Sequence, residues 1–182
     1  MMTKNENSKP WSVPLAAQDV PPEGRHLQIV ADEATCAAIA KLAGALSIAR
    51  VEASYDISPW RGDGLRLSGE VTAVVTQNCV VTLEPIESEI AEPIELTFLP
   101  AAVNASPVTP GTATVPIEGE DPPEPLVNGT IDLGVIATEF LLLGIEPYPR
   151  KPGAVFAPPP AETEAGNPFA VLAALKKGSG EG

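Results

Sequence analysis

Basic side chains are missing from the middle of this chain: between Leu67 and Pro149 it contains no lysine, arginine or histidine. The same stretch holds thirteen aspartate and glutamate residues, and thirteen is also the size of the net charge of the whole protein, -13. A surface of this kind repels the phosphate backbone of nucleic acids and attracts basic polypeptides. The charge by itself fits equally well a protein that is acidic only for solubility.

Cysteines and long apolar runs are also scarce, and each scarcity excludes a class of protein. The two cysteines, Cys36 and Cys79, are too few for a disulfide framework and fit a reducing compartment. The most apolar stretch, residues 131–145, carries two acidic residues and is too short to cross a bilayer. The N-terminus has no apolar run after its lysines, so we expect no secretory signal and a cytoplasmic protein.

Alternation of apolar and polar residues predicts an antiparallel sheet. The segments that alternate with period two are residues 50–57, 65–83 and 86–98. Such alternation is typical of strands with one buried and one solvated face. Short connections at residues 61–64 and 83–85 favour antiparallel neighbours, Pro93 marks an edge or a bulge, and residues 25–31 can add a short strand. The pattern leaves open whether the sheet curls toward a barrel.

Two helices are predicted to cover this sheet. Asp32 is expected to cap the start of the first helix and Gly44 to end it, while Asp132 and Gly144 bound the second. The second helix is apolar over most of its girth, so it is either buried or meets a partner. The predicted fold class is therefore α+β.

The remaining segments are predicted to be irregular, in line with the 21 prolines of the chain. The expected organisation is a flexible N-terminal arm at residues 1–24, an α+β domain at 25–149 with a mobile acidic loop at 100–128, and a disordered tail at 150–182. Trp11, Val13 and Leu15 of the arm are candidates to dock on the domain. Within the tail, Asn167 as cap, Pro168 after it and two closing lysines predict a short helix over residues 167–177. Such a short helix is marginal alone, so we predict that it docks on its own core or on another molecule.

Candidate catalytic and metal-binding residues are few. The only histidine, His26, has no aspartate or cysteine near it in sequence, which favours a structural role. Alternation turns Cys79 toward the core, which favours a small buried apolar residue over a nucleophile. Together with Cys36 these side chains offer too few ligands for a metal site. We therefore predict no catalytic residues, no metal and no cofactor.

Three blocks of sequence, spread over residues 65–177, carry a family resemblance. They are Leu67-Ser68-Gly69-Glu70-Val71 with Cys79 and Leu83-Glu84-Pro85; then Ile131-Asp132-Leu133, Glu139-Phe140-Leu141-Leu142-Leu143 and Pro147-Tyr148-Pro149; and finally Asn167-Pro168-Phe169-Ala170-Val171-Leu172. In this order they resemble the YceD family, whose members are also called large ribosomal RNA subunit accumulation proteins. The resemblance implies a bacterial cytoplasmic protein that supports large-subunit ribosomal RNA levels and ribosome assembly.

Many members of that family carry Cys-x-x-Cys at the position of Cys79, which has prompted suggestions of metal and nucleic-acid binding. Here Thr82 replaces the second cysteine and removes a thiolate that zinc would need. We favour a non-catalytic adaptor that binds a basic ribosomal protein or an rRNA-processing factor, with weak or absent RNA binding. The alternatives are an RNA-binding or metal-dependent nucleic-acid-binding protein, and an enzyme whose site is not recognisable in the sequence.

The candidate site residues form two sets. The predicted partner-binding residues are Leu133, Phe140, Tyr148, Phe169, Leu172 and Leu175. The family-motif residues are Cys79, Leu83, Pro85, Asp132, Leu133, Glu139, Pro147 and Pro149. The first set supplies apolar anchors of the kind that a partner's groove recognises on a helix.

Overall fold

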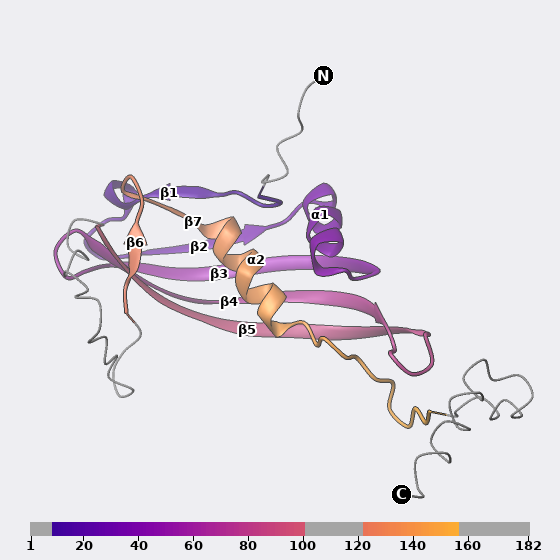
Figure 1. Cartoon of the computed structure of the whole chain (residues 1–182). Coiled ribbons are helices and arrows are strands. Elements are labelled where there is room, and N and C mark those ends of the chain that lie inside the picture. The colour runs from indigo at the N-terminus through magenta and orange to yellow at the C-terminus, as the bar shows by residue number, and fades with distance from the viewer. Residues whose placement is uncertain (1–8, 101–121, 157–182) are drawn as a thin grey trace, which may run out of the picture. The chain divides into compact units, whose positions relative to one another are not determined.

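The centre of the molecule is a five-stranded sheet in the order β2-β3-β4-β5-β6 (Figure 1). The computed structural model describes residues 9–100 and 122–156, of which those up to Lys151 belong to one compact unit and the rest to another. The strands are β2 (Arg25–Val30), β3 (Ser47–Trp60), β4 (Gly64–Asn78), β5 (Pro85–Pro100) and β6 (Glu124–Leu126). The first four pair antiparallel, and β6 lies parallel to the end of β5. The predicted α+β class is confirmed.

In the part of the chain that the structure describes, the sheet is open and does not close into a barrel. The period-two pattern could not decide this, because open and closed sheets share it. Pro93 lies opposite Glu70 in an unbroken register, so it marks an edge strand and not a bulge. The bulge lies in β3 between Ala49 and Glu52, where Arg50 has a φ of 51°.

Both predicted helices form, and their N-caps are the predicted ones. The helices are α1 (Glu33–Ala43) and α2 (Leu133–Gly144); α2 includes Gly144 and has Ile145 as its C-cap. The side chain of Asp32 accepts a hydrogen bond from the backbone N–H of Thr35 at 2.8 Å, and that of Asp132 accepts one from Val135 at 3.3 Å. Gly44 ends α1 with a φ of 66°. Neither helix of the described residues is long and apolar enough to cross a membrane.

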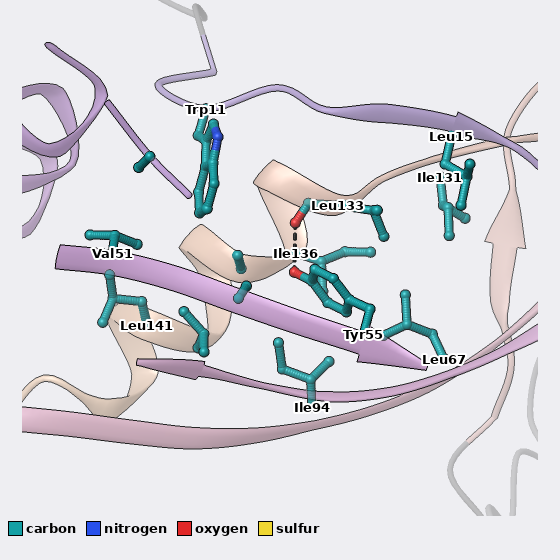
Figure 2. Close-up of a cluster of buried hydrophobic side chains, with 14 of the residues drawn as sticks. Trp11, Leu15, Val51, Tyr55, Leu67, Ile94, Ile131, Leu133, Ile136 and Leu141 are labelled. Atoms are coloured by element: carbon teal, nitrogen blue, oxygen red, sulfur yellow. Dashed lines mark hydrogen bonds between the residues drawn. The ribbon is translucent and has the colours of Figure 1, made fainter. Parts of the chain in front are cut away.

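Both helices pack on one face of the sheet, and α2 crosses this inner face (Figure 1). Tyr55 of β3 is fully buried beneath α2, and its hydroxyl donates a hydrogen bond to the carbonyl of Leu133 at 2.7 Å (Figure 2). Burial raises the pKa of Tyr55, so the phenol stays protonated and remains a donor. This bond ties the first turn of α2 to the middle of the sheet.

The expected flexible arm at residues 1–24 is corrected for the residues that the structure describes. Strand β1 (Pro14–Ala16) pairs antiparallel with β7 (Thr130–Asp132), and a short 3-10 helix, η1 (Ala17–Asp19), follows β1. Trp11, Leu15 and Val20 are buried in the core. The prolines suggested an irregular segment, but burial of these three apolar side chains together with the pairing to β7 offsets the cost of ordering it.

The expected mobile loop at residues 100–128 is corrected at its end. Residues 124–126 form β6, and Leu126 is buried against the main core. A three-residue strand carries too little alternation to be seen in sequence. Residues 101–121 and the predicted helix at 167–177 lie outside the described residues.

We expect Tyr55→Phe to lower the free energy of unfolding by about 1 kcal/mol, because the buried hydrogen bond from the hydroxyl to the carbonyl of Leu133 would be lost. Urea unfolding of the purified protein measures this loss. Tyr148→Phe is the matched control, since Tyr148 is 71% exposed and should tolerate the change. Equal unfolding free energies for both variants would contradict the claim that the hydrogen bond from Tyr55 to Leu133 stabilises the fold.

Candidate partner-binding site

Two segments far apart in sequence meet where β4 ends. Residues 79–84 form the turn between β4 and β5, and residues 145–151 follow α2; we call these two segments together the junction. The hydrogen bonds that hold it are Gln77 Nε2 to Glu146 O (3.0 Å), Val80 N to Pro149 O (2.9 Å), Lys151 N to Cys79 Sγ (3.4 Å) and Lys151 Nζ to Glu84 Oε2 (2.9 Å). The fold thus brings two of the sequence blocks with the family resemblance to one place.

The turn of the junction is tightly closed and holds Leu83 outward. The N–H of Cys79 donates to the carbonyl of Glu84 at 2.8 Å, and the N–H of Leu83 donates to the carbonyl of Cys79 at 2.9 Å. Leu83 has a φ of 61°, a left-handed conformation that costs a residue with a Cβ on the order of 1 kcal/mol. Its side chain is 73% exposed, so this cost is not offset by burial.

Cys79 is completely buried, as predicted, but its surroundings differ from the prediction. Strand β4 ends at Asn78, so Cys79 begins the turn and is not part of the main core cluster. Its sulfur accepts backbone N–H groups of Lys151 and Thr82, both at 3.4 Å. These hydrogen bonds, that of Lys151 first, outweigh burial and lower the pKa of the thiol to about 6. Cys79 is therefore a polar acceptor that joins the two segments.

The three predicted partner-binding residues that the structure describes differ in exposure. Leu133 is 1% exposed and belongs to the core, so its assignment as a surface anchor is wrong. A helical stripe shows which residues share a face but not what covers that face. Phe140 is half-buried against the core, and Tyr148 of the junction is exposed. Phe169, Leu172 and Leu175 lie outside the described residues.

Asp132, another family-motif residue, has a structural role. Besides capping α2 it accepts hydrogen bonds from Val13 N and Ser12 Oγ, each at 2.8 Å. Burial opposes its ionisation, yet these hydrogen bonds leave the pKa of Asp132 lowered. The carboxylate therefore fastens the N-terminal segment to the start of the helix. Glu139 is exposed on α2, Pro85 begins β5, and Pro147 and Pro149 belong to the junction.

Val80 is an exposed apolar residue of the junction that the sequence analysis did not single out. It is 44% exposed and lies in the same turn as Leu83. The alternation over residues 65–83 suggested one continuous strand, and only the early end of β4 reveals a turn. The glutamate-proline pair at 84–85 was the available signal, because the residue before a proline often lies at a boundary.

Two other candidate residues are placed by pairing and burial. His26 of β2 lies opposite Asp56 of β3, and its Nδ1 is 2.9 Å from a carboxylate oxygen of Asp56. The sequence could not show this partner, because it is thirty positions away. Cys36 is buried on α1. Within residues 9–100 and 122–156, no three histidine, cysteine, aspartate or glutamate side chains gather closely enough to hold a metal ion.

A protein-family model matches the chain. The family model described as "Large ribosomal RNA subunit accumulation protein YceD" matches residues 67–176, which include the whole junction. No curated protein matches the chain, and no solved structure matches it. The resemblance noted in the sequence is thereby confirmed at the level of the family.

The hydrogen bonds to Cys79 predict a pH dependence of stability. The pKa of the folded thiol, about 6, lies below its ordinary value of 9.0, so the unfolded chain binds more protons between these values. The contribution of Cys79 to stability should therefore grow as pH rises from about 6 to about 9. Urea unfolding across this range should show the rise in wild type and in Cys36→Ser. In Cys79→Ser the rise should be missing, and its persistence there would contradict the assignment.

Proposed function

The chain belongs to the YceD family, whose description links it to large-subunit ribosomal RNA accumulation, and we propose that it serves this role as a non-catalytic protein-binding adaptor in the cytoplasm. The partner would be a basic ribosomal protein or an rRNA-processing factor. The observation that carries the proposal is the exposure of apolar side chains on a hydrogen-bonded junction. Leu83 is 73% exposed and Tyr148 71%.

The junction has the properties of a preorganised binding surface. Backbone hydrogen bonds hold both of its segments before any partner arrives, which reduces the ordering cost of association. A glycine would relieve the left-handed backbone at Leu83, so the turn itself does not require a leucine. Removing an exposed leucine and tyrosine from water lowers the free energy of the complex with a partner. These features support binding to a protein surface.

Charge supports a basic protein partner over RNA. The only basic residues of the junction are Arg150 and Lys151, and the ammonium group of Lys151 is paired with Glu84 at 2.9 Å. Affinity for RNA comes mainly from lysine and arginine that neutralise phosphates. An acidic surface instead accelerates encounters with basic proteins and disfavours acidic competitors.

The double variant Leu83→Asn/Tyr148→Asn tests the junction, and asparagine is chosen because it tolerates a positive φ. We expect the melting temperature to stay unchanged and recovery of the cellular protein partner in an affinity pull-down to fall by about tenfold or more. Large-subunit ribosomal RNA levels should fall in cells that carry only the variant.

The matched control is Leu42→Asn/Leu46→Asn, which changes two leucines that are 59% and 55% exposed elsewhere on the unit. This control should keep the partner. Undiminished capture by the junction variant would contradict the adaptor proposal.

We further expect the isolated protein to bind ribosomal RNA fragments no better than weakly, because residues 67–149 contain thirteen acids and no base. Filter binding at physiological salt measures the affinity. A dissociation constant below about 1 μM that weakens steeply with salt would instead support the nucleic-acid-binding alternative.

A further inference from the structure

Strand β5 leaves most of one edge of the sheet unpaired. Strand β4 pairs with it from Pro85 to Phe98 on one side, but on the other side β6 reaches only Phe98–Pro100. Among the described residues, no other strand pairs with β5 (Figure 1). An open edge presents N–H and C=O groups that can pair with a further strand. The pairing with β6 shows that this edge accepts one.

The prolines of β5 indicate which residues face the open edge. In an antiparallel pair, every second residue directs its N–H and C=O toward the neighbouring strand. Pro85 and Pro93 have no N–H and lie an even number of positions apart, and the register with β4 is unbroken. Both prolines are odd-numbered. The hydrogen bonds between β4 and β5 therefore keep every N–H donor only if the odd-numbered residues of β5 direct their backbone groups away from β4. Those that then offer a free N–H at the edge are Glu87, Glu89, Ala91 and Glu95.

The two faces of β5 differ in chemistry. Glu87, Glu89 and Glu95 are exposed on the outer face, and no ion pair in the described part of the chain involves them. On the opposite face Ile86 and Ile90 are only half-buried, with Ser88 between them and Glu92 beyond, next to Gly144 of α2. A strand added at this edge would place alternate side chains beside the glutamates and the intervening ones beside the isoleucines.

These glutamates also determine which strands the edge rejects. A second copy of β5 would set glutamate against glutamate, and like charges directly opposite are destabilising. Acidic side chains and prolines are common means of preventing edge-to-edge association. The same charges favour a strand with lysine or arginine at the facing positions.

From this juxtaposition of an open edge, a row of exposed glutamates and two half-buried isoleucines on the opposite face, we infer that β5 binds an extended, basic segment of the partner by strand addition. The segment carries lysine or arginine at every second position and apolar residues between them. This inference rests on the proposed function and names the chemistry of the partner. The basic side chains would lie beside Glu87 and Glu89, and the apolar ones beside Ile86 and Ile90.

A short, fluorescently labelled peptide that alternates lysine with valine is the probe, and the full chain is the receptor. We expect saturable binding by fluorescence anisotropy near physiological salt. Hydrogen exchange at the amides of Glu87, Glu89 and Ala91 should slow on binding, while the amides of Ser88 and Ile90, already paired with β4, should not change. A peptide with the same lysines and valines in two separate blocks should bind more weakly, on the order of tenfold, because it cannot place all lysines on one face.

Three variants separate strand addition from general charge attraction. Ala91→Pro removes one edge N–H without touching the ladder to β4, and it should weaken peptide binding by about tenfold with an unchanged melting temperature. Glu87→Lys/Glu89→Lys should abolish binding. Glu23→Lys/Glu33→Lys makes the same change in net charge at exposed positions outside β5 and should leave most of the binding.

The inference is overturned if the two charge-reversed variants weaken binding equally, or if the peptide with separate lysine and valine blocks binds as tightly as the alternating one. It is also overturned if the hydrogen-exchange rates of the edge amides do not change on binding. Leu83→Asn/Tyr148→Asn should still bind the peptide. If that variant loses the cellular partner while the peptide never binds, the edge inference fails and the proposed function stands. If the peptide binds while that variant keeps its partner, the adaptor role of the junction fails and the edge inference stands.

Discussion

The first turn of α2 joins three parts of the chain through two adjacent residues. The carboxylate of Asp132 accepts a hydrogen bond from the backbone N–H of Val13 in the N-terminal segment. It also caps the helix by accepting one from the N–H of Val135. The carbonyl of Leu133 accepts a hydrogen bond from the hydroxyl of Tyr55, which lies at the centre of the sheet. Because these bonds fix where α2 begins on the inner face, they also fix where its other end delivers residues 145–151. The junction with the turn after β4 therefore depends on hydrogen bonds at the opposite end of the helix.

The arrangement leaves the surface of this unit strongly asymmetric. Both helices cover the inner face of the sheet, while the outer face stays solvated and carries Glu87, Glu89 and Glu95 on β5. The turn at residues 79–84 leads directly into β5, so the exposed apolar side chains of the junction precede the open acidic edge in the chain. The junction and the open edge of β5 are thus only a few residues apart in the chain. Their chemistries are complementary, since one supplies apolar area and the other supplies backbone groups and charge.

Much of the secondary structure could be predicted because its causes are local. The caps at Asp32 and Asp132 depend on backbone groups three residues away, and period-two alternation reports a sheet with one covered face. Cys79 shows the limit of such patterns. Its burial was predicted, but the hydrogen bond from Lys151 to its sulfur comes from seventy-two positions away. The prediction that Leu133 binds a partner failed for a related reason, because an apolar stripe on a helix does not show whether a partner or the chain itself covers it.

The sequence by itself determined the family, the α+β class, the extents of α1 and α2 and the acidic character of residues 67–149. These properties follow from motifs, local capping and composition, which need no knowledge of distant contacts. Only the tertiary structure decided that the sheet of the described residues stays open, that Trp11 is buried in the core, and that the Cys79 turn meets residues 145–151. Each of these depends on pairing or burial between residues far apart in the chain. Such contacts are selected by the packing of the whole core, and no window of sequence records them.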